Sequence, residues 1–125
     1  MKRLAARAIS GLSKLARTIG FHSDPLPLQP AFETFRILDG VYVGGLTMLK
    51  NTGWEMHPDG DEALTLLFGR IDVVLQNPDG DSIIPLEPGR SCVVPKGVWH
   101  RQIVHERSRL LFHTYGDATR HKPQD

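Results

Sequence analysis

The stretch that decides the fold is EMHPDGDE, residues 55–62. Side chains two positions apart on a strand point to the same face of a sheet, so Glu55 and His57 enter one face together. The proline, aspartate and glycine at 58–60 favour a turn that reverses the chain, after which Glu62 begins an antiparallel neighbour. The stretch therefore predicts that His57 and Glu62 lie within reach of a common ion, with Glu55 on the same face.

A second stretch, PKGVWH at residues 95–100, supplies another histidine. Its proline and glycine favour a tight turn that places His100 at the start of the next strand. Two imidazoles and a carboxylate on rigid strands form a nitrogen and oxygen shell that suits Fe, Mn, Ni, Cu or Zn as divalent ions. We therefore predict one divalent metal ion per chain on His57, Glu62 and His100, and these ligand types alone do not identify the metal.

Outward from these stretches, the chain from residue 32 onward consists of short β-rich runs separated by turn residues near 39–40, 44–45, 58–60, 78–80 and 88–89. The runs show neither a helical period nor an internal repeat, and 125 residues suffice for one hydrophobic core. This pattern predicts a single all-β domain, an antiparallel barrel. The predicted strands are residues 32–38, 41–49, 53–57, 62–68, 70–77, 82–86, 91–95, 100–104 and 109–115.

The two stretches, taken together and in this order, resemble the motifs of the cupin superfamily. The first matches the second half of that family's first motif, which reads His-x4-Glu-x6-Gly, and the second matches the pattern Gly-x5-Pro-x-Gly-x2-His. The resemblance spans roughly residues 47–104 and implies a small single-domain, cupin 2-like protein with an antiparallel double-stranded β-helix, the jelly-roll cupin barrel. The matching residues are His57, Glu62 and Gly69 in the first motif, and Gly89, Pro95, Gly97 and His100 in the second.

The chain departs from the cupin pattern at two positions. Glu55 stands where the first histidine is common, and Val104 stands where the second motif commonly ends in asparagine. Three alternatives follow for the site. Glu55 replaces the histidine as an oxygen ligand, the shell shrinks to two histidines and one carboxylate, or the site has lost its metal. Iron is slightly preferred among the candidate metals.

Other side chains are expected around the ion. Gln102, two positions after His100 on the inner face, is the preferred group for orienting a polar substrate. His113 lies in the middle of a strand and is a candidate acid, base or extra ligand in the pocket, with a core or surface histidine as the alternative. The apolar wall of the barrel below Glu62 is predicted to comprise Leu64, Leu66 and Phe68.

The chain divides into four predicted segments: a basic N-terminal helix or tail at 1–23, a proline-rich linker at 24–31, the barrel at 32–117 and a C-terminal tail at 118–125. Apolar and basic residues take opposite sides of a helical wheel before residue 20. Four alternatives remain for this amphipathic helix: docking on the barrel or a partner subunit, a membrane-surface helix, a cleaved targeting peptide, or a mobile tail. We expect a cytoplasmic protein, with organellar targeting as the alternative.

The composition of the chain excludes some classes of partner and of chemistry. A formal net charge of +1 argues against nucleic acid as a partner, and no apolar run is long enough to form a transmembrane helix. Cys92 is the single cysteine, so an intramolecular disulfide is excluded, and we interpret this residue as a small buried hydrophobe rather than a nucleophile.

The favoured function is a metal-dependent enzyme of the oxygenase or isomerase type that acts on a small oxygen-rich organic molecule in the barrel. If Glu62 or Glu55 is not a ligand, it is a candidate general base for proton abstraction. The alternatives are a non-enzymatic cupin that binds or senses a small ligand, and a structural subunit. The resemblance also implies a homodimer, in which a partner covers edge strands near residues 32–49.

Overall fold

The computed structural model describes residues 31–38 and 40–124, the first of these ranges by its backbone alone. Ten strands form in this part of the chain. They are β1 (Ala31–Leu38), β2 (Val41–Met48), β3 (Trp54–Met56), β4 (Glu62–Phe68), β5 (Ile71–Asn77), β6 (Gly80–Leu86), β7 (Ser91–Val94), β8 (His100–Val104), β9 (Ser108–Tyr115) and β10 (Arg120–Lys122). The predicted helix or tail at 1–23 and most of the linker at 24–31 lie outside the described residues.

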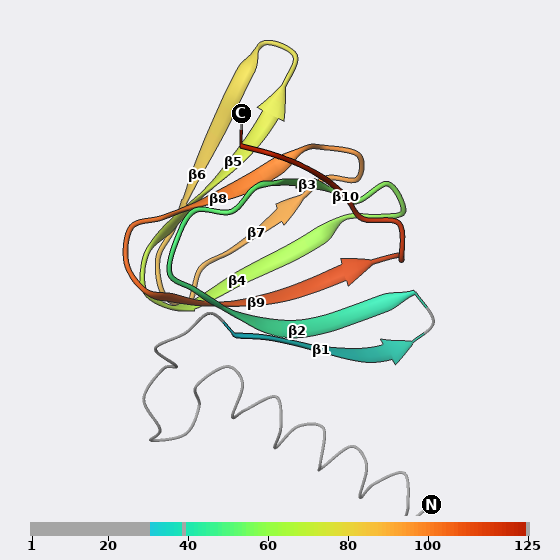
Figure 1. Ribbon diagram of the computed structural model, residues 1–125, viewed down its shortest axis with the longest axis horizontal. Helices are drawn as coiled ribbons and strands as arrows, with labels where there is room; N and C mark the ends of the chain where they lie inside the picture. The colour runs from blue at the N-terminus through green and yellow to red at the C-terminus, as the bar shows by residue number, and fades with distance from the viewer. Residues whose placement is uncertain (1–30, 39, 125) are drawn as a thin grey trace, which may run out of the picture.

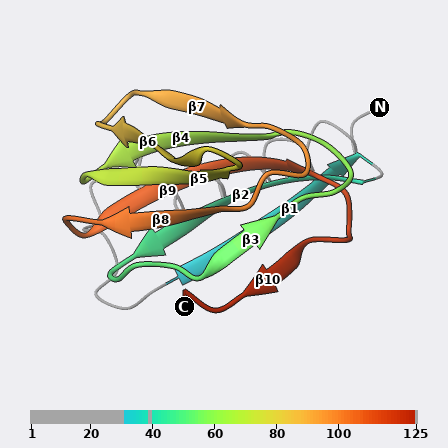
Figure 2. The same ribbon diagram turned by 90° about the horizontal axis from the view of Figure 1, so that it is seen from above.

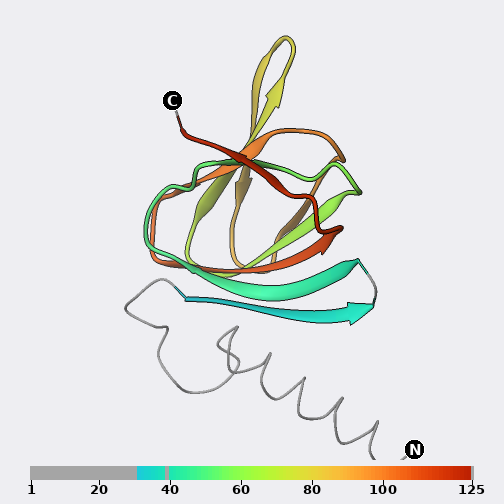
Figure 3. The same cartoon turned by 45° about the vertical axis from the view of Figure 1, so that its right-hand side comes forward.

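Two five-stranded antiparallel sheets build the fold (Figure 1). One has the strand order β1-β2-β9-β4-β7 and the other has the order β10-β3-β8-β5-β6. Seen from the side, the strands surround a common interior, and the hairpin of β5 and β6 projects beyond it (Figure 3). The predicted all-β antiparallel architecture is therefore confirmed. No helix in the described part of the chain is long and apolar enough to cross a membrane.

The core lies between the two sheets and follows the alternation of the strands. Its buried cluster comprises Met48, Leu64, Leu66, Ile71, Val73, Leu86, Val94, Leu110 and Phe112. Leu64 and Leu66 lie inside as predicted, but the prediction for Phe68 is wrong, because its side chain is 44% exposed. The pairing of β4 with β9 shifts register between Leu66 and Phe68, and such a bulge interrupts the alternation that the prediction assumed.

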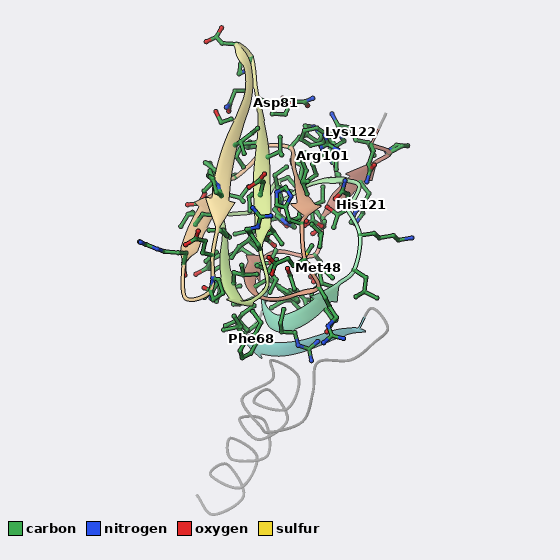
Figure 4. The ribbon with its side chains drawn as sticks, turned by 90° about the vertical axis from the view of Figure 1, so that its left-hand side faces the viewer. Met48, Phe68, Asp81, Arg101, His121 and Lys122 are labelled. Atoms are coloured by element: carbon green, nitrogen blue, oxygen red, sulfur yellow. The ribbon has the colours of Figure 1, made fainter. Side chains whose placement is uncertain are left out.

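The segment at 118–125, expected to be a tail, contains the short strand β10. This strand pairs with β3 in the register Arg120↔Met56, His121↔Glu55 and Lys122↔Trp54, and the two strands run side by side at one rim of the molecule (Figure 2). The Lys122 ammonium lies 4.4 Å from the centre of the Trp99 ring and 5.6 Å from that of Trp54. Arg101, labelled with Lys122 in Figure 4, also covers the Trp54 ring, at 5.1 Å. These cation–π contacts hold β10 against the sheet.

Candidate metal centre

Strand β3 and the turn after it carry Glu55 and His57 to the interior. His57 is buried, and its Nδ1 atom lies 2.9 Å from the hydroxyl oxygen of Thr119. The His57 carbonyl accepts a hydrogen bond of 2.9 Å from the amide of Gly97, where φ is +78°. The turns of the two sequence stretches are thus joined directly, and glycine meets the left-handed conformation that the second turn requires.

Glu62 begins β4 and lies at the middle of the cluster. Its Oε1 atom accepts a hydrogen bond of 3.0 Å from Nε2 of His100, and its Oε2 atom accepts one from the hydroxyl of Thr114. The Nε2 atom of His57 is 3.0 Å from the same Oε2 atom. That nitrogen is buried and has no hydrogen-bond partner of acceptable geometry. It is therefore a polar atom aimed at the centre of the cluster without being satisfied there.

His100 closes the cluster from β8 and is completely buried. Its Nδ1 atom lies 3.3 Å from the carbonyl oxygen of Val98, which can only accept, so the ring presents Nε2 to the interior. This Nε2 atom lies 3.3 Å from Oε1 of Glu55, which is 3.9 Å from Nε2 of His57. The pairing of β3 with β8 sets Glu55 opposite His100 and explains this proximity.

Four side chains therefore offer one ligand atom each, namely Glu55, His57, Glu62 and His100, and these atoms lie within 4.8 Å of one another. Metal–ligand bonds to imidazole nitrogen and carboxylate oxygen are about 2.0–2.2 Å long, so a single ion between the atoms would require only small adjustments. The unsatisfied Nε2 atom of His57 is an available donor for it. The donor set fits a divalent transition metal ion, and the structure brings Glu55 to the same point as the other three.

A cavity of about 540 Å³ opens in front of this cluster. Strands of both sheets and the segment after β9 contribute to its walls. The lining residues are Tyr42, Leu46, Glu55, His57, Glu62, Leu64, Gln102, Leu110, Phe112, Thr114, Gly116, Asp117, Thr119 and His121.

Comparison with solved structures identifies the fold. The chain matches a cupin superfamily protein from Desulfitobacterium hafniense with a TM-score of 0.62 and 20% identity, covering 77% of this chain and 94% of that one. It matches a cupin-2 domain protein from Shewanella frigidimarina with a TM-score of 0.59 and 19% identity, covering 77% and 88% of the two chains. The chain has the cupin fold.

Two larger proteins match this chain over only part of their own length. An oxalate oxidase in complex with glycolate matches with a TM-score of 0.61 at 13% identity over 77% of this chain, and the match covers only 56% of the oxidase chain. The match to peruvianin-I, a cysteine peptidase from Thevetia peruviana latex, likewise covers 56% of that chain. No family model matches the sequence, and no curated protein matches it.

The pKa values of Glu62 and His100 depend on each other and on the other side chains of the cluster. Burial alone would raise the pKa of Glu62, but the hydrogen bond from His100 and the contacts with His57 and Thr114 outweigh burial and lower the pKa to about 2. Burial likewise favours a lower pKa for His100, and the carboxylates of Glu55 and Glu62 outweigh it and raise the pKa to about 9. Without a metal ion, the cluster therefore holds an ionised Glu62 beside a protonated His100.

Gln102 lines the cavity, as its alternation with His100 indicates. Its Oε1 atom accepts a hydrogen bond of 2.8 Å from Thr52, which leaves its amide hydrogens as the groups available to a ligand. His113, in contrast, is not among the lining residues. It lies on the other face of β9 with its ring 5.2 Å from that of Tyr115, because Phe112 and Thr114 take the inward positions.

Three side chains of the candidate site, Thr114, Thr119 and His121, were not predicted from the sequence. Thr114 bonds to Glu62, and the alternation of β9 would have indicated its inward direction if Phe112 had been used to set the phase. Thr119 contacts His57, and His121 lines the cavity although it is exposed. Both follow the last predicted strand, where no apolar pattern signals structure. Cys92 is half-buried, and burial followed by the charge of Glu62 raises its pKa to about 11, which agrees with an unreactive thiol.

Proposed function

We propose that this cupin is a metal-dependent enzyme of the oxygenase or isomerase type, acting on a small oxygen-rich molecule bound in the barrel. The observation that carries the proposal is the convergence of Glu55, His57, Glu62 and His100 within 4.8 Å at the wall of a cavity of about 540 Å³. A divalent ion held there would supply a Lewis acid for a carbonyl oxygen or a redox centre for O₂. Iron is slightly preferred, and Mn, Ni, Cu and Zn are the other candidates.

The charges of the wall favour an uncharged substrate, such as a ketone or a sugar, over a dianion. Among the described residues that line the cavity, three are acids, Glu55, Glu62 and Asp117, and none is lysine or arginine. The two positive charges of a bound divalent ion would be balanced by Glu55 and Glu62, so a dianion would add its charges beside Asp117 with no lysine or arginine among the described lining residues to offset them. The rest of the wall includes Leu46, Leu64, Leu110 and Phe112, which suit the carbon skeleton of a small organic molecule.

Glu62 and Glu55 differ in how readily their carboxylates can take up a proton from a substrate. Both oxygens of Glu62 already accept hydrogen bonds and its side chain is buried, so it is held as an anion. Glu55 is 29% exposed and faces the cavity. If Glu55 does not bind the ion, it is therefore the better general base of the two, taking a proton from a carbon next to a carbonyl. The amide hydrogens of Gln102 would orient a substrate oxygen.

A metal inventory of the purified protein, followed by activity screening, tests the proposal. We expect about one iron or manganese ion per chain in the wild type and none in His57→Ala. The loaded protein should then consume O₂ with a small diketone or sugar, or exchange a substrate C–H proton with deuterated solvent. If the loaded protein does neither with any uncharged ketone, sugar or organic acid tested, the enzymatic proposal is wrong.

A non-enzymatic binding module is the second candidate, and the departure at Glu55 favours it. The usual cupin shell has a third histidine at this position, and its replacement by a carboxylate changes the donor set of the ion. Under this alternative, the purified protein would be free of metal and equally stable with and without added ions. It would nevertheless bind a small ligand in the cavity.

We also propose a homodimer. Strand β1 is at the edge of its sheet, paired only with β2 among the described strands, and an uncovered edge favours pairing with another chain. Size-exclusion chromatography with light scattering should give twice the mass of one chain, and a monomer at all concentrations would contradict the dimer. The helix predicted for residues 1–23 is proposed to dock on a partner or a membrane surface.

A further inference from the structure

The segment that follows β9 forms one wall of the cavity, although it carries none of the four candidate ligands. Gly116, Asp117, Thr119 and His121 all line the cavity. The chain passes from β9 across the rim of the barrel to β10, as Figure 2 shows. We call residues 116–124 the C-terminal strap. Its contacts determine how one wall of the metal centre is held.

Thr119 is the point where the strap contacts the centre. Its Oγ1 atom lies 2.9 Å from Nδ1 of His57, on the side of the ring away from the cluster. An imidazole whose Nδ1–H donates to an oxygen has its lone pair on Nε2, and Nε2 is the atom that faces Glu62 at 3.0 Å. When an ion takes the lone pair of Nε2, the proton of the neutral ring is on Nδ1, and the Thr119 hydroxyl oxygen is placed to accept a hydrogen bond from it. It also fixes the rotation of the ring.

The two histidines are supported in parallel ways. Nδ1 of His100 faces the carbonyl oxygen of Val98, a backbone acceptor close by in sequence. Nδ1 of His57 faces a side-chain hydroxyl 62 residues away. Because the backbone carbonyl cannot be removed by substitution, only the support of His57 can be tested by changing one side chain.

The strap is fixed on the C-terminal side of Thr119, so the hydroxyl is held in place. Strand β10 begins with the next residue, Arg120, which pairs with Met56. Lys122 lies over Trp54 and Trp99 and donates a hydrogen bond of 2.8 Å to Gln76. The side-chain amide of Gln124 donates to the carbonyl of Thr52 at 2.8 Å. The position of Thr119 is therefore set by β3, β5 and the segments that precede β3 and β8, and it does not depend on the ion.

We propose that Thr119 is a positioning residue that holds the orientation of His57, accepts a hydrogen bond from its Nδ1–H in the form that binds an ion through Nε2, and thereby raises the affinity of the centre for a divalent ion. This inference rests on the proposed metal site and assigns a functional role to the strap. Groups that orient a metal-bound histidine typically change metal affinity by about 10- to 100-fold when they are removed.

Titration of the metal-free protein with Co²⁺, followed by visible absorption, tests this role. Thr119→Val removes the hydroxyl at nearly constant volume and should weaken Co²⁺ binding about 10- to 100-fold and alter the absorption bands. Thr119→Ser keeps the hydroxyl and should restore both to near wild type. Thr65→Val serves as the matched control, because Thr65 bonds to Ser91 outside the cavity and its loss should leave Co²⁺ affinity unchanged.

The outcomes separate this inference from the proposed function. If wild type binds no Co²⁺, the metal proposal fails along with the role of Thr119. If wild type binds and Thr119→Val binds equally tightly with the same absorption, only the inference about Thr119 is overturned. A second measurement needs no variant: long-range ¹H–¹⁵N spectra of the Zn²⁺-loaded wild type should show His57 protonated at Nδ1 and bound through Nε2. Binding through Nδ1 would overturn the inference.

Discussion

At the scale of single residues, the centre depends on the carboxylate of Glu62. It lies between two imidazoles and a hydroxyl in a buried position. A buried charge is tolerated only when hydrogen bonds and opposite charges compensate for lost solvation. In the absence of a metal ion, the proton on His100 provides that compensation. A bound ion would take over the same role and displace the proton.

The pH dependence of stability without metal follows from these two groups. The folded pKa of His100 is raised to about 9, so its contribution to stability is complete below its ordinary value of 6.5 and is lost as pH rises through about 9. The folded pKa of Glu62 is lowered to about 2, so its contribution is complete above 4.5 and is lost as pH falls toward 2. We expect the unfolding temperature of chelator-treated protein to be highest between about pH 4.5 and 6.5.

Thermal unfolding of chelator-treated wild type and Glu62→Gln across this pH range checks the expectation. The variant should be less stable and should show a smaller decline in stability between pH 6.5 and 9, because Glu55 is then the one carboxylate of the cluster that favours a protonated His100. If the wild-type protein becomes steadily more stable up to pH 9, His100 does not carry a stabilising proton beside Glu62, and the expectation is wrong.

At the scale of strands and turns, the sequence predicted what depends on local pattern. Alternating side chains and turn residues indicated nine of the ten described strands. The spacing within residues 55–62 and 95–100 also indicated the convergence of His57, Glu62 and His100. Strand β10 was not predicted, because its three polar residues show no alternation of apolar and polar side chains. It also pairs with β3, a strand far away in the sequence. For the same reason Thr119, which precedes it, could not be assigned to the site.

The turn at Gly97 links stability to the geometry of the centre. Gly97→Ala adds a methyl group that meets nothing within 4 Å, so its cost comes from φ of +78° alone and should be about 1–2 kcal/mol of unfolding free energy. Because the Gly97 amide donates to the His57 carbonyl, a shift of the turn should also weaken Co²⁺ binding.

Gly40→Ala is the matched control for Gly97→Ala. Gly40 has φ of +74° and equally open surroundings, and it lies in the turn between β1 and β2. Chemical unfolding and Co²⁺ titration of both variants should show similar losses of stability but weaker metal binding for Gly97→Ala alone. Equal metal affinities in the two variants would show that the turn does not position His57.

At the scale of the whole molecule, the two sheets enclose a cavity whose fixed charges are mostly negative. Asp117 is exposed on the C-terminal strap and accepts a hydrogen bond from the hydroxyl of Tyr42. Asp117→Asn keeps an acceptor for Tyr42 and removes one negative charge. We expect it to strengthen binding of lactate roughly two- to fivefold while leaving acetoin, its uncharged methyl ketone counterpart, unchanged.

Binding of both ligands to the Co²⁺-loaded protein can be followed by the visible absorption of the ion. The gain for lactate should shrink as salt is added, because exposed charges are screened. An equal change for lactate and acetoin would indicate altered shape rather than altered charge, and would contradict the preference for uncharged substrates.

The convergence of two imidazoles and two carboxylates on one ion is the claim on which the functional proposals depend. Anomalous diffraction from crystals grown with Co²⁺ or Mn²⁺ tests it most directly. We expect one strong peak per chain, in contact with Nε2 of His57, Nε2 of His100 and the carboxylates of Glu62 and Glu55. Absence of a peak between these side chains under saturating metal, or a peak only elsewhere on the molecule, would contradict it.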